Sequence, residues 1–236
     1  MRIVVNHLTR MQQGYICVAG LDENKQHIRP VHSGARLGIH LLHRHGGPFD
    51  IGTVVDLGPV QARPTPPEVE DHAFSESRAQ RVGDMSPADF WNLLHDVARP
   101  TLRAIFGEAL TQRGRGCTVD VGMGRASLGC LTPKPGSSAL VVEQYDAPRI
   151  RLLVTDGEYD LSLSVTDLRF YEDDHRTIRA AVVRDVAARL QRGVDLILSV
   201  GLARAWRRDE SEPYRHWLQV NNLHLADDPL WQHQRG

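Results

Sequence analysis

YICVAGLDENKQHIRPV, residues 15–31, is the stretch that decides the expected fold. Its two ends, residues 15–21 and 27–31, are rich in β-branched and other apolar residues, and the polar residues 22–25 between them are typical of a turn. Arg2 to Leu8, just upstream, is also short and β-branched. The first thirty or so residues therefore predict three consecutive strands.

The remainder of the first 80 residues predicts one helix and two further strands. Leucines recur at helical offsets in residues 36–45, and Gly46-Gly47-Pro48 closes that segment. Residues 53–57 and, after a proline-rich turn, residues 69–74 have strand character. Three strands, a helix and two strands is the order of an OB-fold, a five-stranded barrel.

The C-terminal part of the chain repeats this order. Asp156-Gly157 marks a hairpin turn, Asp173 or Asp174 is the expected N-cap of the strongest helix, and Gly193 follows the end of that helix. The predicted elements are strands at 139–145, 149–155 and 159–165, a helix at 177–191, and strands at 194–206 and 216–225. A second OB-like barrel is expected here.

A helical connector and a glycine-rich linker are expected between the two barrels. Ser86-Pro87 is a typical helix start, and the apolar residues that follow share one helix face as far as Pro100. We therefore predict a mainly β protein with some α (α+β): a first OB-like five-stranded barrel at 1–80, a helical connector and linker at 81–136, and a second OB-like barrel at 137–236.

Composition narrows the function classes. The chain has 236 residues, 41% of them hydrophobic, and a net charge of -1, so any nucleic-acid contact must come from a local patch. Cys17, Cys117 and Cys130 are odd in number and lack C-x-x-C spacing, which argues against a disulfide framework or a cysteine zinc site and fits a reducing compartment. Without a signal peptide or an apolar stretch of membrane-spanning length, the chain is expected to be cytoplasmic.

Several motifs together resemble one known family. They are Tyr15–Asp22, His27–Val31, Leu161–Asp167, Leu196–Leu202 and His216–Val220. In this order they resemble the dual OB-containing domain (DuOB) family over nearly the whole chain. The resemblance implies a scaffold used in prokaryotic conflict and defence systems, where members look like nucleic-acid or nucleotide recognition modules. It implies no set of catalytic residues.

The strongest candidate binding site is the connection between the last two predicted strands. In OB-folds this loop is one of two that grip oligonucleotides, where arginines neutralise phosphates and aromatic rings stack on bases. The expected nucleic-acid-binding residues are Arg204, Trp206, Arg207, Arg208, Tyr214, Arg215, His216, Trp217 and, closing the third strand, Arg29. An alternative stays open, in which the tryptophans turn into the core and the arginines of the loop pair with carboxylates. In this alternative Arg29 pairs with a carboxylate between the barrels.

Two clusters could supply a metal, and the enzyme alternative given below depends on one of them, but each has a simpler interpretation. His40, His43 and His45 have no acidic residue or cysteine beside them, and Asp173-Asp174-His175 lacks a neighbouring lysine and is explained by helix capping. No metal and no cofactor is expected.

The leading prediction is a binding module for nucleic acid or a nucleotide. A neighbouring defence protein is a further expected partner, and no association with a membrane is expected. The alternatives are a metal-dependent enzyme acting on nucleic acid or nucleotides, and a protein-binding scaffold.

Overall fold

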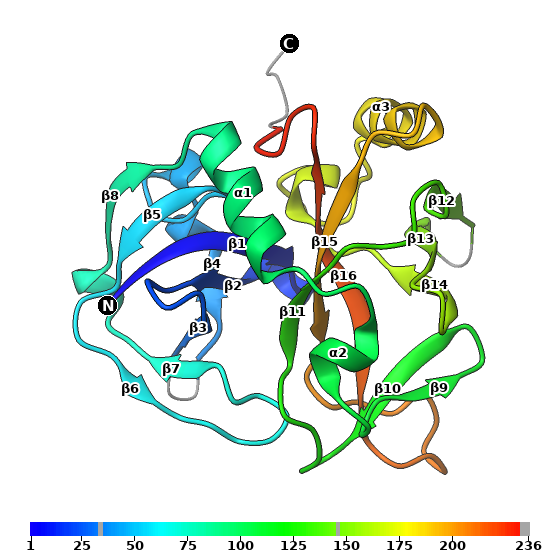
Figure 1. Cartoon of the computed structure of the whole chain (residues 1–236). Coiled ribbons are helices and arrows are strands. Elements are labelled where there is room, and N and C mark those ends of the chain that lie inside the picture. The colour runs from blue at the N-terminus through cyan, green and yellow to red at the C-terminus, as the bar shows by residue number, and fades with distance from the viewer. Residues whose placement is uncertain (33–34, 145–146, 232–236) are drawn as a thin grey trace.

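The computed structural model describes residues 1–32, 35–144 and 147–231. Two halves, each rich in β-structure, lie side by side and are joined through helices α1 and α2 (Figure 1). The fold is mainly β with few helices, and a curled sheet with further sheets fits a dual OB-type domain, as expected. Among the described residues, no helix is both long and apolar enough to cross a membrane.

The first half is built on one eight-stranded sheet with the order β6-β7-β3-β2-β1-β5-β8, in which β4 pairs with β2 off this path. All pairs are antiparallel except β3 with β7. The three strands expected from the opening stretch are confirmed. The strands are β1 (Arg2–Arg10), β2 (Tyr15–Leu21), β3 (His27–Val31), β4 (Leu37–Gly38), β5 (Thr53–Asp56), β6 (Gln61–Ala62), β7 (Asp71–Ala73) and β8 (Gln80–Asp84).

The helix expected at residues 36–45 is wrong. The segment forms β4 and two single 3-10 turns, Ile39–Leu41 and His43–His45, with Leu42 extended between them (ψ 143°). Leu42 is extended because the neighbouring backbone pairs with Phe49, whose carbonyl accepts from His43 N at 2.8 Å. The leucines are buried, but a tertiary contact overrides their helical spacing.

The connector helices form as expected. Helix α1 (Pro87–Val97) begins after Ser86, whose Oγ accepts from Asp89 N at 3.1 Å. Helix α2 (Leu102–Phe106) begins after Thr101, whose Oγ1 accepts from Ala104 N at 3.2 Å. The hydrophobic cores separate between these helices: α1 packs into the first core and α2 into the second.

The second half contains a five-stranded sheet with the order β11-β15-β16-β10-β9 and a three-stranded sheet with the order β12-β13-β14. The long helix α3 (Ala180–Gln191) packs against β12. The strands are β9 (Thr111–Arg113), β10 (Gly116–Asp120), β11 (Leu128–Leu131), β12 (Ala139–Glu143), β13 (Arg149–Thr155), β14 (Asp160–Ser164), β15 (Leu196–Leu202) and β16 (Arg215–Leu225).

Residues 107–136, expected to be a linker, therefore supply three strands of the second half. At least one of their glycines allows a close approach between elements. A Cβ on Gly129 of β11 would lie only 2.3 Å from Cγ2 of Ile105, so glycine allows α2 to approach the sheet closely. The division of the chain at residues 80 and 136 stays a prediction.

The expected cap of α3 is wrong. The helix begins after Arg179, which makes no side-chain cap, and Asp174 instead closes the turn before it. The Asp174 carboxylate accepts from the backbone N of Arg176 and Thr177, both at 2.8 Å. An aspartate can hold a preceding turn as readily as a helix end, and the sequence did not distinguish the two.

Polar side chains join the two halves along the seam between β1 and β16. Asn222 in β16 accepts from Leu8 N at 2.7 Å and donates to Leu8 O at 3.2 Å, so its amide substitutes for a strand partner. Glu70 accepts from Ser127 N at 2.8 Å, from Ser127 Oγ at 2.7 Å and from Leu128 N at 3.2 Å. A carboxylate from the first half thus holds the start of β11 in the second.

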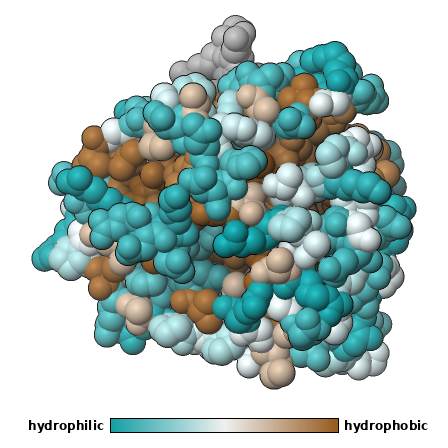
Figure 2. Space-filling view, in the orientation of Figure 1, coloured by the Kyte–Doolittle hydropathy of each residue, from teal (hydrophilic) through white to brown (hydrophobic). Residues whose placement is uncertain are grey.

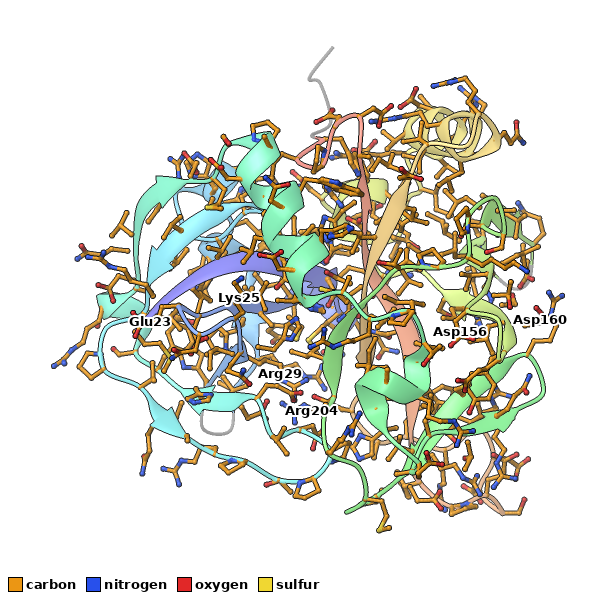
Figure 3. All side chains as sticks on the ribbon, viewed as in Figure 1. Glu23, Lys25, Arg29, Asp156, Asp160 and Arg204 are labelled. Atoms are coloured by element: carbon orange, nitrogen blue, oxygen red, sulfur yellow. The ribbon has the colours of Figure 1, made fainter. Side chains whose placement is uncertain are left out.

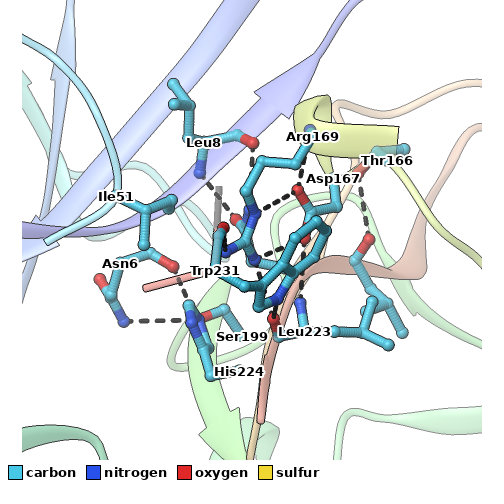
Figure 4. A network of polar contacts seen from close by, with 12 residues as sticks. Asn6, Leu8, Ile51, Thr166, Asp167, Arg169, Ser199, Leu223, His224 and Trp231 are labelled. Atoms are coloured by element: carbon cyan, nitrogen blue, oxygen red, sulfur yellow. Dashed lines mark hydrogen bonds and ion pairs between the residues drawn. The ribbon is translucent and has the colours of Figure 1, made fainter. Parts of the chain in front are cut away.

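A buried ion pair lies beside this seam (Figure 4). Arg169 Nη2 lies 2.8 Å from Asp167 Oδ2, and both side chains are almost fully buried. Arg169 also donates to the carbonyls of Leu223, at 2.8 Å, and Trp231, at 3.1 Å, and its guanidinium stacks 3.8 Å from the Trp231 ring centroid. Because every bond of this pair goes to backbone or to the partner, the two charges are compensated inside the protein.

Candidate nucleic-acid interface

The connection between β15 and β16, residues 203–214, lies at the lower end of the second half, beside the hairpin of β9 and β10 (Figure 1). Its base continues the strand pair: Trp206 N donates to Arg215 O at 3.0 Å, and Arg215 N to Trp206 O at 3.1 Å. Around this end the molecular surface is mainly hydrophilic or neutral (Figure 2). A rigid hairpin base therefore carries the exposed loop of residues 207–214.

Aromatic rings and guanidinium groups alternate on this loop. Trp206 and Tyr214 are 44% and 53% exposed, which is unusual for large rings. Trp217 is buried beneath them, with its ring centroid 5.6 Å from that of Trp206. Arg208 stacks 3.7 Å from the Trp217 ring, and Arg207 lies 5.1 Å from the Tyr214 ring. Flat faces next to delocalised cations are the elements that stack on bases and contact phosphates.

A hollow of about 460 Å³ opens between the loop and the β9–β10 hairpin. Trp217 lines it, and its Nε1 is buried without a hydrogen-bond acceptor among the described residues. The other lining residues are Arg113, Gly114, Arg208, Ser211, Glu212, Pro213 and Arg215. The hollow thus combines an indole wall with three guanidinium groups.

The hairpin contributes two arginines that sequence reasoning did not assign to the site. Arg113 and Arg115 are exposed, and neither side chain forms an ion pair or hydrogen bond with another described residue. Gly114 between them has φ 60°, a left-handed turn that favours glycine. The Arg-Gly-Arg-Gly pattern at 113–116 is the feature of the sequence that indicates these two arginines, but its glycines also predict a linker.

The acidic residues of the loop cancel only part of its positive charge. Asp209 accepts from Ser211 N and Oγ, both at 2.9 Å, which holds the pKa of its carboxyl below the usual range. Arg207 donates to the backbone carbonyl of Glu210 at 2.9 Å, not to its carboxylate. Arg215 is paired, with Nε 3.1 Å from Asp120 Oδ1. Among the described residues at this end of the molecule, Arg207, Arg208 and the two hairpin arginines have no carboxylate partner and are available to a ligand.

Arg29 and Arg204 face carboxylates instead of the loop surface. Arg29 is buried, with Nε 2.5 Å from Asp71 Oδ1. Arg204 reaches Asp71 Oδ2 at 2.7 Å and Glu68 Oε1 at 2.9 Å. Figure 3 shows both arginines where the two halves meet. Arg29 thus pairs with a carboxylate of its own sheet, in β7, and it is Arg204 that reaches this carboxylate from the other half.

His216 also points inward, with Nδ1 3.0 Å from the carbonyl of Ala203. Together with Arg29 and Arg204 it supports the base of the loop. We use the name "arginine–tryptophan surface" for the group that faces outward: Arg113, Arg115, Trp206, Arg207, Arg208 and Tyr214, with Trp217 as its floor.

The two clusters set aside as metal sites do not converge. Asp173 pairs with Arg44 at 3.0 Å, Asp174 holds a turn, and His175 is buried. His40 lies 3.2 Å from Glu76 Oε2, a carboxylate far from it in the sequence. Within the described ranges, neither segment brings three metal-ligating side chains together.

Comparison with known proteins agrees with this architecture. The sequence model of a family described as "Dual OB-containing domain" matches residues 1–223, which include both halves and the whole arginine–tryptophan surface. No curated protein shows significant similarity to the chain.

Proposed function

Since the chain belongs to the dual OB-containing domain family, we propose that it binds single-stranded nucleic acid on the arginine–tryptophan surface. OB-folds in general bind oligonucleotides, and the loop before their last strand is a common contact. The observation that carries the proposal is the exposure of Trp206 and Tyr214 beside Arg208, which stacks on Trp217. These two rings are exposed on the same loop, and a base can stack on each.

The charge of the molecule fits a local contact. Because the net charge is -1, nonspecific attraction to polyanions is weak, and binding depends on the few arginines without a carboxylate partner. Single-stranded nucleic acid offers both unpaired bases and phosphates, which a duplex does not present together. A free nucleotide would use the same chemistry with one base and is the second ligand to test.

The test is a titration of labelled single-stranded DNA and RNA oligonucleotides followed by fluorescence anisotropy. Loss of one base stack costs about 1–3 kcal/mol, so Trp206→Ala is expected to weaken binding about 5- to 150-fold. The matched control is Arg184→Ala with Arg192→Ala, two exposed arginines in α3 and directly after it. Helix α3 lies at the opposite end of the second half (Figure 1), so this variant should bind as the parent does. Absence of binding, or equal binding by Trp206→Ala, would overturn the proposal.

The biological setting is a separate matter. A place in prokaryotic defence systems, a neighbouring defence protein as partner and a cytoplasmic location stay predictions from the resemblance and the composition. The enzyme alternative depended on Asp173-Asp174-His175 or the histidines at 40–45, whose partners in the structure are protein groups. We therefore propose binding rather than chemistry.

A further inference from the structure

Three side chains with metal-binding atoms meet in the seam between the halves. His7 in β1, His27 in β3 and Cys130 in β11 each offer one ligand atom, and these atoms all lie within 4.8 Å of one another. Cys130 Sγ is 3.9 Å from His27 Nε2, and the two imidazole rings meet edge to face at 5.0 Å. The first two residues belong to the sheet of the first half and the third to the sheet of the second.

The hydrogen bonding around the cluster is incomplete. His7 is 1% exposed, yet its Nε2 has no partner among the described residues, and neither has the buried Oδ1 of Asn6. A buried polar atom without a partner is costly, so each calls for an explanation such as an ion. The Asn6 amide lies within the cluster: its Nδ2 is 3.4 Å from both His27 Nε2 and Cys130 Sγ.

We propose that His7, His27 and Cys130 bind a divalent transition metal of the zinc class, which ties the two halves together. Zinc takes imidazole nitrogen and thiolate sulfur in a tetrahedral arrangement, whose bond lengths place ligand atoms about 3.5 Å apart. The three ligand atoms, now within 4.8 Å of one another, need only a small inward movement of their side chains to reach these separations. The fourth position falls to water or to the Asn6 amide, whose oxygen and nitrogen can be exchanged by a turn about χ2.

The surroundings suit such an ion. Asn221 Nδ2 lies 3.0 Å from His7 Nδ1. With the oxygen and nitrogen of this amide exchanged, Nδ1–H donates to the amide oxygen, which fixes the ring and leaves Nε2 free for the metal, as partners of metal-bound histidines commonly do. Metal binding requires neutral imidazoles and a thiolate, so uptake of the ion releases the proton of the Cys130 thiol. His27 is only half-buried, which gives the ion a route of entry.

This site is independent of nucleic-acid binding, and it differs from the expectation that no metal is bound. That expectation rested on the absence of C-x-x-C spacing, which cannot reveal ligands drawn from β1, β3 and β11. Only the pairing of the two halves brings them together.

The experiment is a titration of the metal-free full-length chain with Co²⁺ and Zn²⁺. One Co²⁺ per chain is expected, with the intense visible bands of a tetrahedral ion and a thiolate-to-cobalt band in the near ultraviolet. Cys130→Ser should lose the thiolate band, and Asn221→Ala should weaken binding about 10- to 100-fold. Cys117→Ser, which changes a buried cysteine of the second core, is the matched control and should keep both the stoichiometry and the spectrum.

Two results would overturn the proposal. One is a folded chain that takes up no stoichiometric Co²⁺ or Zn²⁺, and the other is a thiolate band that survives in Cys130→Ser. If Cys130→Ser does not fold, His27→Gln at the half-buried position provides the same test, with at least a tenfold loss of Co²⁺ affinity expected.

Discussion

Arg204 Nη2 lies 2.7 Å from Asp71 Oδ2, although the two residues belong to different halves of the molecule. The other oxygen of the same carboxylate accepts from Arg29 Nε at 2.5 Å. Asp71 therefore neutralises the charge of the buried Arg29 in the first half, and through Arg204 it holds the base of the β15–β16 connection. The loop that carries the exposed rings is positioned by an acid in β7.

Replacing Asp71 should destabilise the fold strongly. Asp71→Asn leaves the buried Arg29 without its ionic partner, and removing one member of a buried pair costs about 3–5 kcal/mol. The measurement is the free energy of unfolding by urea. Asp120→Asn is the matched control, since it breaks the pair with Arg215 at a side chain that is 65% exposed, where about 0–1 kcal/mol is expected. Equal effects of the two substitutions would contradict this account.

Glu70 should hold the start of β11. Its carboxylate accepts three hydrogen bonds from Ser127 and Leu128, and bonds to a charged acceptor are worth about 1.5–3 kcal/mol. We expect Glu70→Ala to lower the free energy of unfolding by at least that amount and to speed amide hydrogen exchange at both residues. Ser127→Ala removes one bond only and should have a smaller effect. Unchanged exchange in Glu70→Ala would show that β11 is held by other contacts.

The hairpin arginines should set the salt dependence of binding. Each phosphate neutralised on a single strand contributes about 0.7 to the slope of log affinity against log salt. Arg113→Ala with Arg115→Ala is expected to reduce that slope by about 1.4. The measurement is anisotropy at several salt concentrations, with Arg184→Ala and Arg192→Ala as the reference. A slope that stays the same would exclude the hairpin from the contact.

Asp174 should contribute stability that depends on pH. Hydrogen bonds from Thr177 Oγ1 and from the backbone N of Arg176 and Thr177 lower the pKa of its carboxyl from 3.8 to about 2. A lowered pKa in the folded state means that this stabilisation is fully present above about pH 4 and is lost as the pH falls towards 2. Asp174→Ala should therefore differ from the parent in free energy of unfolding at pH 6 and converge with it near pH 2. A difference that does not change with pH would contradict this.

Much of the first half could be predicted from local pattern. The bounds of β2 and β3 match the expected residues 15–21 and 27–31, because apolar, β-branched runs separated by a polar turn favour two strands and the turn that joins them. The start of α1 at Ser86-Pro87 is equally local. Residues 36–45 show the limit, because their leucines are spaced for a helix but the pairing with Phe49 stretches the chain.

The candidate site, too, could be predicted from the sequence only in part. Sequence alone identified the loop with its arginines and tryptophans, since residue types reveal stacking and charge. It could not tell that Arg29 and Arg204 pair with Asp71, or that Arg113 lines the same hollow as Trp217. These relations join residues far apart in the chain, and no spacing encodes them.

By itself, then, the sequence determined the strands β1, β2 and β3, the start of the connector helix α1 and the chemical character of the last loop, because backbone preference and side-chain type are local properties. The tertiary structure alone decided which charges are free and which are paired, that residues 107–136 join the second sheet, and that His7, His27 and Cys130 meet. The physical reason is that pairing and burial depend on how the two halves dock, a property of the whole chain.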